Sequence, residues 1–348
     1  MENVAFNRAT HLDFHVDDVE PFKLAKDILK TILQFRRSPT SSTCGLSCRS
    51  CQSPHLPRLA SAIKEARPIT FVLPAFPGKS PNLSKVLGTL PDMAERLALQ
   101  FLEQLCERIR AIYSPGARII VCSDGRVFSD IVGMRETDVT DYQHELEKMI
   151  HEFDLKHISL FNLDELCNGK DFMQVRHELV EKFGVPLRVL KEKVLRGSKA
   201  LSPPDDEEAH RVYCGITRFL VEDAIVPGQT KSRSAVQKEC RAKAYEVIRR
   251  SNAWSELIAQ RFPGAVRLSI HPQTCGSKKI GIRLIATESW MTPWHGVAVK
   301  TNDEFVLLKR VEAEALGAQL VFSDNGRPSH FELSKSIQPN LVIEKSEV

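Results

Sequence analysis

The chain has 348 residues, of which 42% are hydrophobic and 26% charged, so it can bury a large core as one α/β domain or two smaller ones. Its 48 basic and 44 acidic residues nearly balance, and a net charge of +4 with 7% aromatic residues does not indicate a nucleic-acid-binding surface. Nine cysteines, a polar start and the lack of a membrane-length apolar stretch indicate a reduced, cytoplasmic protein with no membrane partner.

Helical and strand patterns alternate in the first half of the chain. Apolar residues at helical spacing predict a helix over 21–37, after which the segment 38–54 breaks all periodicity and indicates a loop. Short apolar runs predict three strands, over 68–76, 117–124 and 157–163. Amphipathic patterns between them predict helices over 91–112 and 142–153. This rhythm predicts an α/β fold with a largely parallel sheet covered by helices.

The second half changes character near Gly264. Residues 171–262 are mostly helical in pattern, with breaks at 197–206 and 226–234. After Gly264 the chain is β-rich, and its strand-like runs are AVRLSIHP, KKIGIRLIA, HGVAVK, EFVLLKR and AQLVFSD. We expect three parts: an N-terminal helix and cysteine-containing loop (1–61), a catalytic α/β domain (62–335) and a polar tail (336–348).

Charged and polar side chains lie next to several predicted strands. Ligands of α/β proteins bind outside the carboxyl ends of strands, where the loops gather reactive groups. The candidate residues in these loops are Lys79, Ser123, Asp124, Arg126, Arg267, His271 and His295. The set suits an anionic, carbonyl-bearing substrate handled by acid–base chemistry, and no nucleotide fingerprint accompanies it.

The tripeptide GKS at 78–80 is similar to the end of a phosphate-binding P-loop, but Leu73 stands where that loop requires glycine. Pro74 and Pro77 also remove two amides that would cradle a phosphate. Lys79 can still bind a phosphate or carboxylate as a point charge, or it can be a solvated loop lysine.

Three cysteines in the predicted loop, Cys44, Cys48 and Cys51, have the spacing C-x3-C-x2-C. This spacing holds an iron–sulfur cluster in radical enzymes that use S-adenosylmethionine, although Ser50 stands where an aromatic residue usually precedes the third cysteine. His55 could instead complete a tetrahedral zinc site with the cysteines. Free thiols are the third interpretation, and we expect no metal in the chemistry.

Several candidates also have a structural interpretation. Asp124 can cap the amides of a turn, while Arg126 offers a planar fork that fits a carboxylate or phosphate. Arg218, in the segment YCGITRFLVED, either binds substrate or forms an ion pair on a helix surface near Asp223.

Together these segments resemble the isocyanide (isonitrile) synthase family, of the pyoverdine/dityrosine biosynthesis type. The matching stretches cover most of residues 68–300 and are FVLPAFPGKSPN, KVLGTLPDMAERLAL, CSDGRVFSDIVG, YCGITRFLVED, RLSIHP and TPWHGV. The resemblance implies a Rossmann-like fold without a bound dinucleotide. It also implies an enzyme that converts the amine of an amino acid, typically tyrosine or tryptophan, into an isocyanide with ribulose 5-phosphate as carbon donor. The residues inside matched motifs that it carries into the candidate site are Lys79, Asp124, Arg126, Arg218, Arg267, His271 and His295.

The implied reaction suits these residues. The ketone carbon of the sugar and the isocyanide carbon are at the same oxidation level, so we expect no cofactor. A general base near neutrality, His271 or His295, can transfer the protons, and Asp124 can orient a histidine or bind sugar hydroxyls. The residues expected to hold the amino-acid carboxylate and the sugar phosphate are Lys79, Ser123, Arg126, Arg218 and Arg267. The expected partners are the amino acid, ribulose 5-phosphate and a downstream oxygenase of the same pathway.

Two other functions stay open from the sequence. A phosphosugar aldolase or transferase could use Lys79 as a Schiff base, but such a lysine needs an apolar pocket, and Gly78 and Ser80 are unsuited to one. The second is a non-catalytic metal-binding or regulatory protein built around the three loop cysteines and His55.

Overall fold

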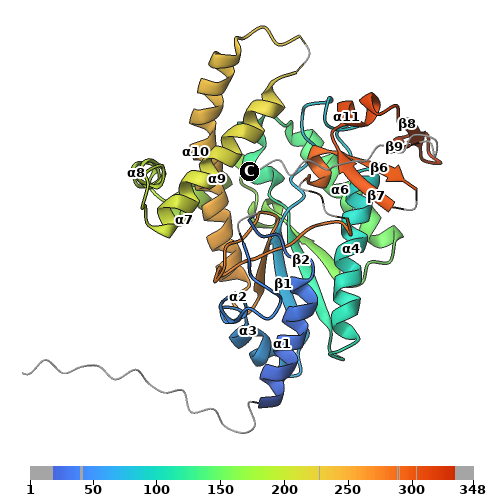
Figure 1. The fold of residues 1–348 in the computed structure, drawn as a ribbon. Coiled ribbons are helices and arrows are strands. Elements are labelled where there is room, and N and C mark those ends of the chain that lie inside the picture. The colour runs from blue at the N-terminus through green and yellow to red at the C-terminus, as the bar shows by residue number, and fades with distance from the viewer. Residues whose placement is uncertain are drawn as a thin grey trace, which may run out of the picture.

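A parallel five-stranded sheet forms the centre of the molecule (Figure 1). The computed structural model describes residues 19–333, apart from 40–41, 227, 288, 290 and 303, and it describes only the backbone of Val19. The predicted tail 336–348 lies outside the described residues. The strands are β1 (Ile69–Pro74), β2 (Ala117–Cys122), β3 (Ile158–Phe161), β4 (Val266–Ser269) and β5 (Ile280–Gly281). They pair in the order β3-β2-β1-β4-β5, and every pair is parallel. The predicted α/β class is confirmed, and this order matches the first five strands of the Rossmann arrangement.

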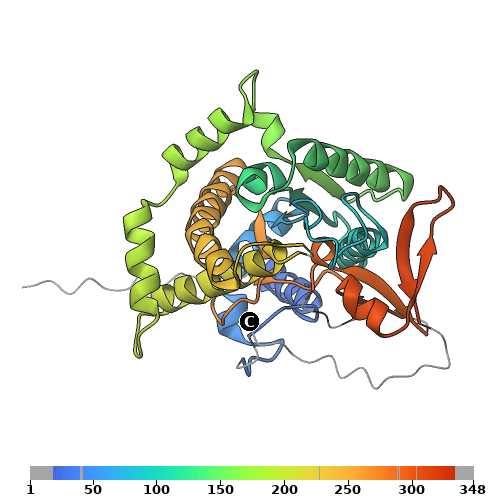
Figure 2. The ribbon, with the colours of Figure 1, turned by 90° about the horizontal axis from the view of Figure 1, so that it is seen from above.

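Helices cover both faces of this sheet because side chains alternate between the faces along each strand. Phe71 and Leu73 of β1 enter one apolar core, and Val72 enters the other. The first core is closed by α1 (Val19–Leu33), α3 (Leu56–Lys64), α4 (Met93–Arg110) and α6 (Glu136–Glu152). The second is closed by α5 (Gly125–Val132), α7 (Phe172–Phe183), α9 (Pro204–Ala224) and α10 (Arg233–Arg261). Seen from above, α4 and α10 lie on opposite sides of the sheet (Figure 2).

The predicted helical region 171–262 is confirmed, and it adds an outer layer. The helix α8 (Leu187–Gly197) packs against α9 and α10 instead of the sheet. Among the described residues, no helix combines the length and the apolar character that a membrane span requires.

A second sheet of four strands makes up the C-terminal third, whose predicted β-rich character is confirmed. Its strands are β6 (Val297–Thr301), β7 (Glu304–Leu308), β8 (Gln319–Phe322) and β9 (Pro328–Glu332), and α11 (Arg310–Ala315) lies between β7 and β8. The order is β7-β6-β9-β8, with β6 and β9 parallel and the outer pairs antiparallel. Ala298 and Leu307 of this sheet pack with Ala94 at the start of α4. This contact holds the second sheet near the carboxyl edge of the first.

Several elements differ from the sequence-based expectation, among them the helices α3 and α11, over which no helix was predicted. The helix α2 (Arg49–Gln52) interrupts the predicted loop, and α5 occupies residues in which only a turn was expected. With four and eight residues, both helices are too short to show a helical period. β5 has only two residues, and β9 was not predicted because its sequence PSHFE contains little apolar character.

Candidate active site

Loops from four parts of the chain meet at the carboxyl edge of the parallel sheet. The loop after β1 contains Lys79, the loop after β2 contains Asp124, and the loop after β4 contains His271. The fourth part is the short 3-10 helix η3 (Pro293–His295), which precedes β6. In this class of fold, ligands bind where the strand order reverses, which here is between β1 and β4.

Lys79 lies fully buried, and its ammonium group has three protein partners. Nζ lies 2.9 Å from Asp92 Oδ2 and 2.8 Å from Glu95 Oε2, and it donates to the Pro293 carbonyl at 3.1 Å. Asp92 and Glu95 form the capping box that starts α4, so these ion pairs fix the loop after β1 to that helix. The interpretation of Lys79 as a solvated lysine is therefore wrong.

The charge state of Lys79 follows from these partners. Burial alone would lower the pKa of Lys79, but the carboxylates of Asp92 and Glu95 more than offset this effect and raise that pKa. A lysine that stays charged is not a nucleophile, so the surroundings of Lys79 do not suit a Schiff base. Burial also raises the pKa of Glu95, whose Oε1 accepts a hydrogen bond from Tyr142 Oη at 3.1 Å.

Asp223, near the end of α9, connects the loop after β1 to the histidine of η3. Its Oδ1 accepts hydrogen bonds from Ser80 Oγ at 2.7 Å and from Lys85 Nζ at 2.6 Å. Its Oδ2 lies 3.6 Å from His295 Nε2. The side chains of Asp223 and Lys85 are 6% and 5% exposed, so solvent screens their ion pair only weakly. The structure thus brings together residues from the segments GKSPN, FLVED and TPWH.

His295 is held in place by the side chains around it. Its Nδ1 lies 3.2 Å from Thr292 Oγ1, and its ring lies 5.1 Å from the ring of Phe219. The preceding residue, Trp294, is buried against Phe76, with ring centroids 5.3 Å apart. Burial lowers the pKa of His295 to about 4. Its imidazole is therefore neutral at pH 7 and able to accept a proton.

Asp124 places a carboxyl group with few polar contacts at this edge of the sheet. It follows β2 directly and stands at the N-cap position of α5, but its side chain makes no capping hydrogen bond, so the turn-capping interpretation is wrong. Its Oδ1 is buried and has no hydrogen-bond partner among the described residues. Burial raises the pKa of Asp124 from 3.8 to about 7. A carboxyl group that titrates near neutrality and has an unpaired oxygen is suited to proton transfer.

Ser123 and Arg126, on either side of Asp124, contact other protein groups. Ser123 Oγ donates to the Phe76 carbonyl at 2.8 Å. Arg126 is buried and pairs with Glu136 Oε2 at 2.8 Å and with Asp164 Oδ1 at 3.1 Å. Each of the three guanidinium nitrogens of Arg126 donates to a protein acceptor. In this structure both side chains hold the loop after β2 in place.

Two cations are neighbours in the register of β4 and β5, Arg267 near the start of β4 and Lys279 just before β5. Arg267 is half-buried and bonded to Ser255 of α10, and burial lowers its pKa. Lys279 precedes β5 and is also half-buried, and its pKa is lowered by burial and by the charge of Arg267. The carboxylate of Glu256 offsets part of the repulsion between these two half-buried cations, and a bound anion would offset more of it. His271, in the loop after β4, is exposed to solvent.

Arg218 lies on another face of α9 from Asp223. Its side chain is 55% exposed and its Nε lies 3.4 Å from Glu222 Oε1, which is the helix-surface ion pair that the sequence left open. Residues five apart on a helix are rotated by about 140°, whereas Phe219 and Asp223, four apart, share a face toward His295. Asp223 is thus a site residue that was not selected from the sequence, although it lies in the segment that pointed to Arg218.

The three loop cysteines lie together, but their fourth neighbour is not the predicted one. The sulfur atoms of Cys44, Cys48 and Cys51 gather with that of Cys275, all within 4.8 Å of one another. His55 is buried at the N-cap position of α3 and does not belong to this group. The prediction that His55 completes a metal site is wrong.

Known proteins resemble this chain over most of its length. Residues 59–321 match the family model described as pyoverdine/dityrosine biosynthesis protein. The chain is 43% identical over 323 residues to the L-tryptophan isonitrile synthase AmbI1 of Fischerella ambigua, covering 92% of this chain and 98% of that protein. It is 44% identical over 322 residues to an L-tyrosine isonitrile synthase of Pseudomonas aeruginosa, covering 91% and 95%. The fold is similar to the crystal structure of PvcA from Pseudomonas aeruginosa, with a TM-score of 0.82 and 46% identity over 89% of this chain and 100% of that one. The chain therefore belongs to the isocyanide synthase family, of the pyoverdine/dityrosine biosynthesis type.

Proposed function

We propose that this isocyanide synthase converts the amine of an L-amino acid into an isocyanide, with ribulose 5-phosphate as carbon donor and an aromatic amino acid as the preferred substrate. Relatives named as L-tryptophan and L-tyrosine isonitrile synthases support the amino-acid class. The observation that carries the proposal is the carboxyl group of Asp124, which combines a pKa of about 7 with an unpaired buried oxygen at the carboxyl edge of the sheet.

The proposed reaction balances without an oxidant. The amine attacks the ketone carbon, water leaves, and the resulting imine carbon then loses both of its carbon–carbon bonds. One bond breaks with its electron pair left on the former ketone carbon, and the departing fragment becomes an aldehyde as its hydroxyl group loses a proton. The other bond breaks with its pair on the second departing fragment, which takes up a proton. The oxidation level of that carbon is therefore unchanged. The amine loses two protons overall, so the site needs groups that accept and return protons, each worth about 10²–10⁴-fold in rate.

Asp124 and His295 are the groups that we assign to these transfers. At neutral pH, Asp124 is present in both protonation states, so it can accept a proton and return it. His295 is neutral and acts as the second base, with Asp223 placed to stabilise the imidazolium that forms. His271 is the alternative base, since it lies at the carboxyl end of a strand.

Arg267 and Lys279 are the cations that we assign to a substrate anion, either the amino-acid carboxylate or the sugar phosphate. They are half-buried neighbours whose pKa values are lowered, and a bound anion would relieve their repulsion. Lys79 and Arg126 instead act by positioning, because their donors already engage carboxylates of the protein.

The proposal is tested with ribulose 5-phosphate that carries carbon-13 at the ketone carbon. The enzyme is incubated with this sugar and a mixture of amino acids, and products are identified by mass spectrometry. We expect an isocyanide of an aromatic amino acid that contains the label. The absence of isocyanide with every amino acid, or an isocyanide without the label, would contradict the proposal. Borohydride added during turnover should trap no sugar adduct on Lys79, whereas such an adduct would support the aldolase reaction.

A further inference from the structure

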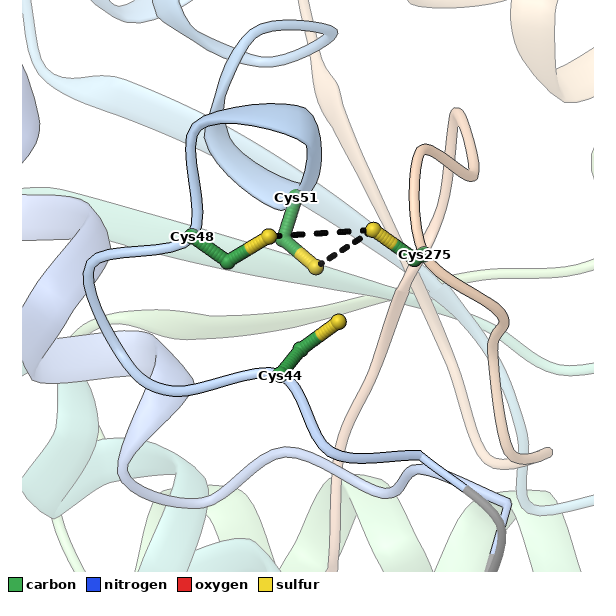
Figure 3. A group of neighbouring side chains, drawn as sticks. All are labelled: Cys44, Cys48, Cys51 and Cys275. Atoms are coloured by element: carbon green, nitrogen blue, oxygen red, sulfur yellow. Dashed lines mark hydrogen bonds between the residues drawn. The ribbon is translucent and has the colours of Figure 1, made fainter.

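Four thiol groups converge on one point, and none of them is among the groups assigned to proton transfer. Figure 3 shows Cys44 and Cys48 on the loop before α2, Cys51 on α2 and Cys275 on the opposite chain segment, with all four sulfur atoms directed toward a common centre. Cys275 belongs to the connection between β4 and β5 and lies 224 residues from Cys51. The four cysteines are free thiols in the structure.

The distances between the sulfur atoms fit one tetrahedral ion. Zinc bound to thiolates has Zn–S distances of about 2.3 Å, so the sulfur atoms of a regular ZnS₄ tetrahedron are about 3.8 Å apart. Cys275 Sγ lies 3.7 Å from Cys48 Sγ and 3.5 Å from Cys51 Sγ, and no pair in the group exceeds 4.8 Å. A four-iron cluster would hold its thiolates farther apart, because they bind at the outer corners of a cube.

Groups around the sulfur atoms can stabilise the negative charge of four thiolates. Arg36 Nη1 lies 3.5 Å from Cys51 Sγ, and Nη2 of the same guanidinium donates to the Cys44 carbonyl. The backbone amides of Cys51 and Gly276 face the sulfur atoms of Cys48 and Cys51. Cations and N–H donors of this kind stabilise thiolate ligands and fix their orientation.

We propose that Cys44, Cys48, Cys51 and Cys275 bind one zinc ion. Four thiolates fill the tetrahedral coordination sphere, so the ion has no open position for substrate and is structural. It would fasten the N-terminal segment to the connection between β4 and β5, which also contains His271. The site shares no residue with Asp124, His295 or Asp223.

The first test uses the full chain, purified without a histidine tag. We expect about one zinc ion per chain by elemental analysis, and X-ray absorption should show four sulfur neighbours at about 2.3 Å with no nitrogen. Replacement of zinc by cobalt(II) should give the intense visible bands of tetrahedral thiolate coordination. Protein without bound metal, a disulfide between these cysteines, or iron in place of zinc would overturn the assignment.

The second test compares variants at the ligands with matched controls. Cys275→Ser and Cys44→Ser should lose most of the zinc and lower the melting temperature by about 5–10 °C. Cys214→Ser, at an exposed cysteine outside the group, should keep the zinc content and the melting temperature of the wild type. His55→Asn should keep its zinc as well. Loss of zinc in His55→Asn together with retention of zinc in Cys275→Ser would overturn the proposal. If a ligand variant does not fold, the metal content of the wild-type protein tests the proposal instead.

Discussion

Burial moves the pKa values of the two proposed proton-transfer residues in opposite directions, because it disfavours the charged form of each. The pKa of Asp124 is raised to about 7, and the pKa of His295 is lowered to about 4. Of the two, only Asp124 therefore changes its charge near neutral pH. The pH dependence of the reaction can separate their roles.

Asp124→Asn tests this assignment directly. An amide has the shape of the carboxyl group but cannot transfer a proton, so we expect kcat to fall at least ~100-fold with an unchanged circular dichroism spectrum. The wild-type profile should contain an ionisation near pH 7 that the residual activity of the variant lacks. The exposed Asp205→Asn serves as control and should behave as wild type. An ionisation near pH 7 that persists in Asp124→Asn would assign it to another group.

The raised pKa of Asp124 also predicts how stability depends on pH. Between about pH 4 and pH 7 the folded protein keeps the proton on Asp124, whereas the unfolded chain, with a pKa near 3.8, loses it. The contribution of Asp124 to the free energy of unfolding therefore decreases as pH rises through this range. Urea unfolding gives the free energy of unfolding of wild type and of Asp124→Asn at pH 5 and pH 7.5. Relative to the variant, wild type should be less stable at pH 7.5 than at pH 5. A difference between the two proteins that is the same at both pH values would contradict the shift.

At the scale of elements, the loop after β1 is fixed from two sides. Lys79 binds it to the capping box of α4, and Gly125 lets the first turn of α5 approach it closely. A Cβ atom on Gly125 would lie 1.8 Å from the Pro77 carbonyl oxygen. The positions of Lys79 and Gly125 thus determine where the loop meets Asp124.

Lys79→Met should destabilise the protein much more than it changes substrate affinity. The substitution leaves the carboxylates of Asp92 and Glu95 buried without their cation, and breaking a buried pair in this way costs about 3–5 kcal/mol. Urea unfolding measures the loss, and Glu95→Gln in the same chain should restore part of it. Unchanged stability together with a large rise in KM for ribulose 5-phosphate would show instead that Lys79 binds the phosphate.

Gly125→Ala should displace the loop after β1, because the backbone oxygen of Pro77 cannot give way as a flexible side chain could. We expect a lower melting temperature and a kcat reduced at least ~10-fold, on the scale of the loss that a small misplacement of reacting groups causes. Gly88→Ala is the matched control, since a Cβ at Gly88 meets no atom within 4 Å. Equal melting temperatures and equal kcat values in the two variants would show that the close approach of Gly125 to Pro77 has no functional importance.

At the scale of the whole molecule, the sequence was sufficient to predict the parallel sheet, because its strands are short, apolar and separated by strongly amphipathic helices. It was also sufficient to name the loops at the carboxyl edge. It could not predict the partners of Lys79 and Arg126, since Glu95 and Glu136 lie on helices whose rotation is set by packing. The sequence also could not predict that Cys275 lies beside the loop cysteines, because no local spacing relates it to them.

Asp223 connects segments that are distant in the sequence. Variants at Asp223 and His295 therefore test whether these segments act together in the reaction. The carboxylate of Asp223 joins Lys85 of the loop after β1, the helix α9 and His295 next to the second sheet. We expect His295→Gln to lower kcat at least ~100-fold, as for a lost acid–base group. Asp223→Asn should lower kcat by a smaller factor and leave KM nearly unchanged, because it acts through the histidine.

A double-mutant cycle tests whether Asp223 and His295 act as one unit. If Asp223 works by stabilising the imidazolium of His295, its removal has little further effect once the histidine is gone, so the double variant should be about as slow as His295→Gln alone. Arg267→Lys, at a group assigned to anion binding, should instead combine with His295→Gln nearly multiplicatively. If the effects of Asp223→Asn and His295→Gln multiply, the two residues act independently. If His295→Gln keeps near-full kcat while His271→Gln loses it, the base is His271, and Asp223 serves only to hold Lys85 and the loop after β1.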